Sequence, residues 1–195
     1  MPPVPTHEPR PLRKPGARLG FVDDLRKQKK WPLEPPGINP DVPTATPYLL
    51  IRANATDTGV RPLAGAVAAH SAGIEILDTA RNLILTPAAG QSYHLRATVW
   101  NLGATASYAG LADFYVAPRA EIKVARAGTR TLPAQGHTGF VVRSGESIVV
   151  ESPNVWTPAN ATEAQESVLV QVADLLLDPL GKPFDWIGNR HVALW

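Results

Sequence analysis

The chain has 195 residues, of which 44% are hydrophobic and 20 are prolines, and its net charge at pH 7 is +2. The length accommodates one ordinary domain with an additional segment, and the proline content argues against a helical bundle, because proline breaks helix interiors. The sequence contains no cysteine, which excludes disulfides, thiolate zinc sites and a thiol nucleophile.

Positive charge is concentrated at the start of the chain. Residues 1–31 hold eight basic and three acidic side chains, a net charge of +5, whereas the remaining residues hold 11 basic and 14 acidic side chains, a net charge of −3. A basic segment beside a mildly acidic body indicates a binding arm. The short run RKQKK has no interleaved aromatic residues, so we expect protein partners in a multi-protein assembly rather than nucleic acid.

Residues 1–47 form the predicted arm, since they carry 12 of the 20 prolines and favour extended polyproline geometry. One gap between the prolines contains FVDDLRKQKKW, residues 21–31, with apolar residues at helical spacing, acidic residues early and basic residues late. This pattern predicts a short amphipathic helix. It is either an incidental apolar cluster in a disordered tail or, as we expect, a docking motif made of Phe21, Val22, Leu25, Arg26, Lys27 and Trp31.

After Pro47 the sequence changes to short apolar runs separated by proline and glycine. This pattern is typical of an antiparallel sandwich, and we predict an all-β, immunoglobulin-like fold of about seven strands over residues 48–195. Residues 161–166 suggest a helical turn, and we expect no further helix in the body. The expected strands lie within residues 48–55, 73–77, 82–87, 90–103, 110–117, 138–152, 167–178 and 189–195.

The clearest strand covers residues 93–100. Its apolar positions Tyr93, Leu95, Ala97 and Val99 alternate with His94, Arg96, Thr98 and Trp100. Such alternation predicts a half-buried strand with the first set facing the core. Trp100 then lies on the outer side and is a candidate for surface recognition.

Several stretches together resemble bacterial immunoglobulin-like domains of the CARDB type (cell-adhesion-related domain found in bacteria). They are HSAGIEIL, GQSYHLRATVWNLGATASYAGLADFYV with Val99, Asn101 and Gly103 at its corner, ESIVVESPNVWTP, SVLVQVADLLLDP and NRHVALW. The resemblance covers about residues 70–195. It implies a seven-stranded sandwich with an adhesive, spacer or assembly role and no catalytic residues. At the corner we expect turn chemistry, because Asn101 and Gly103 tolerate or prefer positive φ and an asparagine side chain can bond its own nearby backbone.

Motifs for catalysis are not found in the sequence. The five histidines form no metal-binding pattern, and neither a phosphate-binding loop nor a nucleophile elbow is present. Asp174, Asp178 and Asp185 lie near the last loop, but their spacing matches no calcium loop. We therefore predict turn capping for these carboxylates and expect no metal, no cofactor and no enzymatic activity.

The sequence predicts a non-enzymatic structural or interaction protein. In this interpretation the arm anchors an immunoglobulin-like domain to a bacterial or phage-like assembly, such as a virion or contractile injection device, for decoration, adhesion or assembly. No secretory h-region or apolar membrane-spanning run is visible, so we expect the protein in the cytoplasm or in an assembled particle. The alternative is a carbohydrate-binding module, which requires an exposed strip formed by Trp100, Trp156 and Trp186 and fails if these residues are buried.

Overall fold

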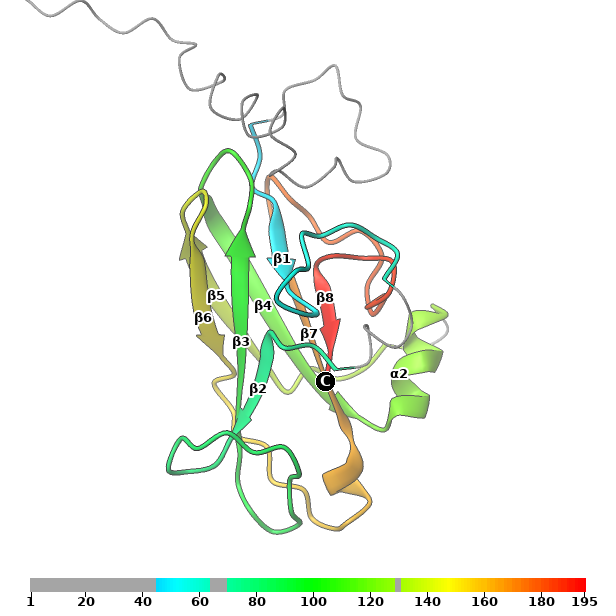
Figure 1. Cartoon of the computed structure of the whole chain (residues 1–195). Helices are drawn as coiled ribbons and strands as arrows, with labels where there is room; N and C mark the ends of the chain where they lie inside the picture. The colour runs from blue at the N-terminus through cyan, green and yellow to red at the C-terminus, as the bar shows by residue number, and fades with distance from the viewer. Residues whose placement is uncertain (1–44, 64–69, 129–130) are drawn as a thin grey trace, which may run out of the picture. The chain divides into compact units, whose positions relative to one another are not determined.

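The computed structural model describes residues 45–63, 70–128 and 131–195, which all belong to one unit of the chain. These residues form two four-stranded antiparallel sheets, so the predicted β-sandwich is confirmed (Figure 1). The strands are β1 (Leu49–Ile51), β2 (Ile74–Leu77), β3 (His94–Asn101), β4 (Ser107–Ala117), β5 (Gly136–Val142), β6 (Ser147–Glu151), β7 (Ser167–Asp174) and β8 (Val192–Leu194).

The first sheet is built around β3. Residues 96–100 of β3 pair with β6 on one edge, and its other edge pairs with β2 over residues 94–97 and with β1 over residues 99–101. The second sheet has the strand order β5-β4-β7-β8, with β4 and β7 in its centre. The predicted turn between β5 and β6 is present, and Gly145 adopts a φ of +78° there.

The main core lies between the two sheets and follows the alternation in the sequence. Along β3 every second residue from Leu95 to Asn101 is buried, as predicted. Phe114, fully buried in β4, fills the space between the sheets together with residues of β7. Burial of apolar surface on this scale is the dominant stabilising contribution in a sandwich. The buried residues from β3, β4 and β7 are Leu95, Ala97, Val99, Ala112, Phe114, Val168, Val170 and Val172.

A second core covers the outer face of the β4-β7-β8 sheet. Here the helix α2 (Arg119–Arg126) and residues 180–187 pack against the sheet beside β7 and β8 (Figure 1). The expectation of no further helix in the body was wrong. The helix begins after Pro118 and buries only Ile122 and Ala125, so its apolar stripe is too short to stand out in the sequence. The remaining members of this core include Tyr115, Leu132, Leu169, Phe184, Trp186, Val192 and Leu194.

Two short segments can be compared with their predictions. Residues 82–87 do not form the expected strand, and only Leu83 makes an isolated bridge, to Leu77. The Asp78 carboxylate accepts hydrogen bonds from the backbone and side chain of Asn82, so the chain turns instead of continuing as an extended pair. The predicted helical turn is present as a 3-10 helix, η2 (Glu163–Gln165).

Candidate functional site: the root of the N-terminal arm

The arm residues predicted to dock on a partner lie outside the described residues. They are Phe21, Val22, Leu25, Arg26, Lys27 and Trp31. The structure does describe the point at which the arm joins the sandwich. There, the backbone oxygens of Ala45, Thr46 and Tyr48 accept hydrogen bonds from Thr105 Oγ1, Ala104 N and Leu102 N at 3.2, 3.2 and 2.9 Å. The root of the arm is therefore fastened to the corner between β3 and β4.

Asn101 is the centre of this corner and is fully buried. Its Oδ1 accepts hydrogen bonds from the backbone N–H groups of Tyr48 and Gly103, both at 3.0 Å. Its Nδ2 donates to the backbone oxygens of Thr105 at 2.8 Å and Val142 at 3.3 Å. All the donors and two acceptor positions of the amide are used, so Asn101 connects the arm root, the corner and β5.

Gly103 has a different role from the predicted one. Asn101 does bond its own nearby backbone, as predicted, but neither Asn101 nor Gly103 is among the residues with positive φ. Instead, a Cβ on Gly103 would lie 2.3 Å from Thr46 O, 2.4 Å from Tyr48 N and 2.5 Å from Pro47 C. Because these are backbone atoms that cannot swing away, glycine is required for the close approach of the arm root.

Asp178, which follows β7 of the second sheet, binds the start of β1 in the first sheet. Its Oδ2 accepts a hydrogen bond from Leu49 N at 2.8 Å and lies 3.0 Å from His191 Nε2, while Oδ1 binds Arg190 Nη2. Burial raises the pKa of this carboxyl, but His191, Arg190 and the Leu49 N–H together hold the pKa below its ordinary value. The carboxylate is thus kept charged by the groups that it joins.

Tyr48 makes contacts through its backbone, its ring and its hydroxyl group. The Arg190 guanidinium lies 4.0 Å from the ring centroid, and the hydroxyl donates to Gly59 O at 3.3 Å. Burial is the largest effect on the hydroxyl and raises its pKa. We call Tyr48, Asn101, Gly103, Asp178 and Arg190 the root clasp.

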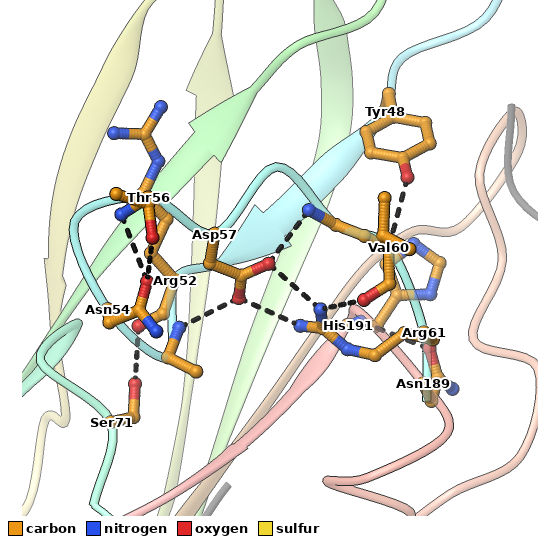
Figure 2. Close-up of polar contacts among 12 residues, drawn as sticks. Tyr48, Arg52, Asn54, Thr56, Asp57, Val60, Arg61, Ser71, Asn189 and His191 are labelled. Atoms are coloured by element: carbon orange, nitrogen blue, oxygen red, sulfur yellow. Dashed lines mark hydrogen bonds and ion pairs between the residues drawn. The ribbon is translucent and has the colours of Figure 1, made fainter. Parts of the chain in front are cut away.

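The loop after β1 is fixed by a buried ion pair next to the clasp (Figure 2). Asp57 accepts two hydrogen bonds from the Arg61 guanidinium, at 2.9 and 3.2 Å, and two from Ala53 N and Gly59 N, at 2.9 and 2.8 Å. Burial raises the pKa of Asp57, yet these donors hold it below its ordinary value. The Asp57–Arg61 ion pair positions Gly59, and the carbonyl oxygen of Gly59 accepts the hydrogen bond from the Tyr48 hydroxyl.

The tryptophans do not form a common exposed strip among the described residues. Trp156 packs against Tyr93 with ring centroids 5.8 Å apart, and Trp186 belongs to the second core; each is 5% exposed. Trp100 is half-buried, with the Arg52 guanidinium 3.9 Å from its ring centroid. The guanidinium is stacked on one face of this ring.

The acidic side chains near the last loop bind different segments. Asp174 accepts hydrogen bonds from Ser107 Oγ at 2.7 Å and from backbone N–H groups of the following turn. Asp185 accepts from Arg126 Nε at 2.7 Å and from Gly188 N at 3.1 Å. The contacts of Asp174 and Asp185 agree with the predicted turn capping, whereas Asp178 binds Leu49 N, Arg190 and His191 and does not cap a turn. Within the part of the chain that is described, no group of three His, Asp or Glu residues is arranged to hold a metal ion.

Sequence reasoning missed most of the root clasp. Asn101 and Gly103 were singled out for their turn chemistry, whereas Tyr48, Asp178 and Arg190 were not assigned to any site. Asp178 lies 129 residues from its partner Leu49, so no local spacing could have predicted the contact.

No protein-family model matches this chain, and no curated protein matches it. The structure is similar to two structures of the CARDB domain of a protein from Pyrococcus furiosus. The crystal structure, described as a complex with di-metal ions, is 12% identical and covers 80% of this chain and 90% of that chain, with a TM-score of 0.42. The solution NMR structure is 14% identical and covers 63% and 90%, with a TM-score of 0.36.

Across the described residues, the helices are too short or too polar to cross a membrane.

Proposed function

We propose that the protein is a non-enzymatic interaction module whose sandwich holds the root of the N-terminal arm, so that the arm can dock on a larger assembly. The observation that carries this proposal is the root clasp. Together with residues 102–105 of the corner between β3 and β4, it fixes Ala45 to Leu49 by contacts from the end of β3, from this corner and from the segment after β7, which is more than a simple linker requires.

A fixed root favours binding through an extended segment. Residues 1–47 carry 12 prolines, and a chain restricted by proline loses less conformational entropy when it is ordered on a partner. The apolar residues Phe21, Val22, Leu25 and Trp31 would supply the contact, while Arg26 and Lys27 would steer it toward an acidic partner. The assembly is a bacterial or phage-like particle in this proposal.

The use of the buried carboxylates supports a non-enzymatic role. Asp57, Asp174 and Asp178 each accept three or more hydrogen bonds or ion-pair contacts from neighbouring segments. Carboxylates held in this way brace loops, whereas a general base needs an accessible lone pair near its substrate. Their environment is that of structural groups.

The test compares the full chain with a chain lacking residues 1–44, both expressed in the source cells. This deletion leaves Ala45 and the root clasp intact. We expect the full chain to sediment with the native particle fraction and the deleted chain to remain in the supernatant. The substitutions F21S, L25S and W31S in the full chain should have the same effect, whereas V4S, outside the motif, should have none.

Circular dichroism provides the folding control for these variants. Unchanged sedimentation of the deleted chain, with an unchanged spectrum, would refute the docking role of the arm.

A further inference from the structure

The strand β5 is an edge strand of the second sheet. It pairs with β4 on one side, and within the described residues no strand pairs with its other side. Together with β6, which follows it in the chain, it forms one side of the sandwich (Figure 1). Gly139 in the middle of β5 is exposed, and Val141 is 52% exposed. An exposed edge offers unpaired backbone groups to another strand.

The register of the sheet shows which backbone groups of β5 face outward. In an antiparallel sheet, alternate residues of a strand bond to one neighbouring strand and the residues between them bond to the other. Ala109 O accepts a hydrogen bond from Leu175 N, in register with β7, so the odd-numbered residues of β4 bond to β7 and the even-numbered residues bond to β5. The partners of the even-numbered residues in β5 are Gly136, Thr138 and Phe140. The N–H and C=O groups of His137, Gly139 and Val141 therefore point to the free edge, where no described residue bonds to them.

Other edge strands are partly closed by neighbouring residues. Ser71 N donates to Leu194 O of β8 at 2.8 Å, and Thr138 Oγ1 donates to Glu151 O of β6 at 2.5 Å. The edge of β5 has no such cover among the described residues. Its sequence GHTGFVV also contains no lysine, proline or acidic residue, the residues by which natural edge strands avoid pairing with another chain.

A second copy of β5 matches this edge. With a two-fold axis beside Gly139, the two strands run antiparallel, Gly139 lies opposite Gly139 of the second copy, and His137 lies opposite Val141 of the second copy. The outward groups then form three residue pairs that exchange two hydrogen bonds each. The axis position has room, because a Cβ on Gly139 would meet only Gly110 O at 3.9 Å.

Charge complementarity favours a second copy as the partner. Arg143 is exposed just beyond one end of β5, and Asp113 of β4 lies beside the other end, with its Oδ1 2.6 Å from His137 Nδ1. The two-fold axis brings Arg143 of each copy toward the Asp113 end of the other copy, opposite Gln135, and no two charged residues of β5 or its ends are opposed. The contact with Asp113 also holds the His137 ring toward β4 and away from the free edge.

We propose that two copies of this chain associate through β5, so that their β5-β4-β7-β8 sheets join into one continuous antiparallel sheet. Pairing along one strand edge buries less surface than a standard interface of about 1,600 Å², so the expected dissociation constant is about 10–100 µM. The proposal goes beyond the proposed function and does not depend on it, because it uses β5 and no residue of the arm.

The test is sedimentation velocity of the full chain from about 1 to 300 µM, a range that brackets this affinity. We expect a monomer of 20.9 kDa at the lowest concentration and an increasing dimer fraction above it. Gly139→Lys and Gly139→Glu each place like charges opposite each other at the axis and should raise the dissociation constant about fivefold. An equimolar mixture of these two variants should dimerise at least as well as the wild type, because opposite charges then face each other.

Gly181→Lys is the matched control. Gly181 is also exposed, and a Cβ there would meet only Asn189 Nδ2 at 3.9 Å, but it lies in the segment after β7. This variant should change the dissociation constant less than about twofold. Amide hydrogen exchange of the wild type locates the contact, because exchange at His137, Gly139 and Val141 should slow as the dimer fraction rises.

Three results would overturn the proposal. A wild type that stays monomeric over the whole range would leave the β5 edge to a strand of another protein or to no partner. A dimer that is equally strong in Gly139→Lys and Gly181→Lys, with unchanged exchange at His137, Gly139 and Val141, would place the contact elsewhere. A mixture that dimerises no better than Gly139→Lys alone would exclude the axis at Gly139. Thermal unfolding checks that each variant is folded.

Discussion

Replacement of Asn101 by alanine tests the root clasp most directly. The substitution removes four hydrogen bonds at a fully buried position. The N–H groups of Tyr48 and Gly103 lose their acceptor, and the carbonyl groups of Thr105 and Val142 lose a donor. Asn82→Ala is the matched control, because Asn82 is exposed and its side chain makes a single hydrogen bond, to Asp78.

The magnitude follows from the burial of these partners. A typical hydrogen bond contributes about 1 kcal/mol net, but a buried group left without a partner costs about 1–3 kcal/mol. Two stranded donors and two weakened acceptors therefore predict a loss of about 4 kcal/mol from the free energy of unfolding. This is a large part of the roughly 5–15 kcal/mol available to a domain. For Asn82→Ala we expect a loss below about 1 kcal/mol.

Urea unfolding of the full chain, followed by circular dichroism, measures both values. With an m-value of about 2 kcal/mol/M, Asn101→Ala should lower the midpoint by about 2 M, and Asn82→Ala by less than about 0.5 M. Equal midpoints for the two variants would refute the idea that Asn101 joins the arm root to the sandwich.

Three further substitutions probe the rest of the structure. Gly103→Ala should destabilise the fold by about 2 kcal/mol or more, because its Cβ would clash with backbone atoms of the arm root. Gly139→Ala is the control and should be nearly neutral, since a Cβ there meets only Gly110 O at 3.9 Å. Thermal unfolding compares the two variants, and similar losses of stability would contradict the close approach of the arm root to Gly103. Because the folded-state pKa of Asp178 is held below its ordinary value, its stabilising contribution is present above about pH 4 and is lost as the pH falls through the lower folded-state pKa. Asp178→Asn should therefore be less stable at pH 7 and lose less stability on acidification, which urea titrations from pH 7 to pH 2 measure; an unchanged pH dependence would contradict this role. Trp186→Ala should cost about 3–5 kcal/mol if the second core is part of the cooperative fold, and a loss below about 1 kcal/mol would show that it is not.

The fold was predictable because its signals are local. The alternation from Tyr93 to Trp100 depends only on neighbouring residues, since successive side chains of a strand point to opposite faces. Proline and glycine mark the turns in the same way. The helix α2 was missed because only Ile122 and Ala125 are buried on it, too few to produce a helical period in the sequence.

The candidate site was decided by the tertiary structure. The sequence by itself indicated that a proline-rich basic segment precedes a β-sandwich and that Asn101 and Gly103 form a corner between two strands. Only the folded chain shows why, because the partners lie far away: Tyr48 is 53 residues from Asn101, and Leu49 is 129 residues from Asp178. Contacts over such separations depend on how the two sheets pack. The corner residues therefore fasten the arm root, a role that turn chemistry alone did not reveal.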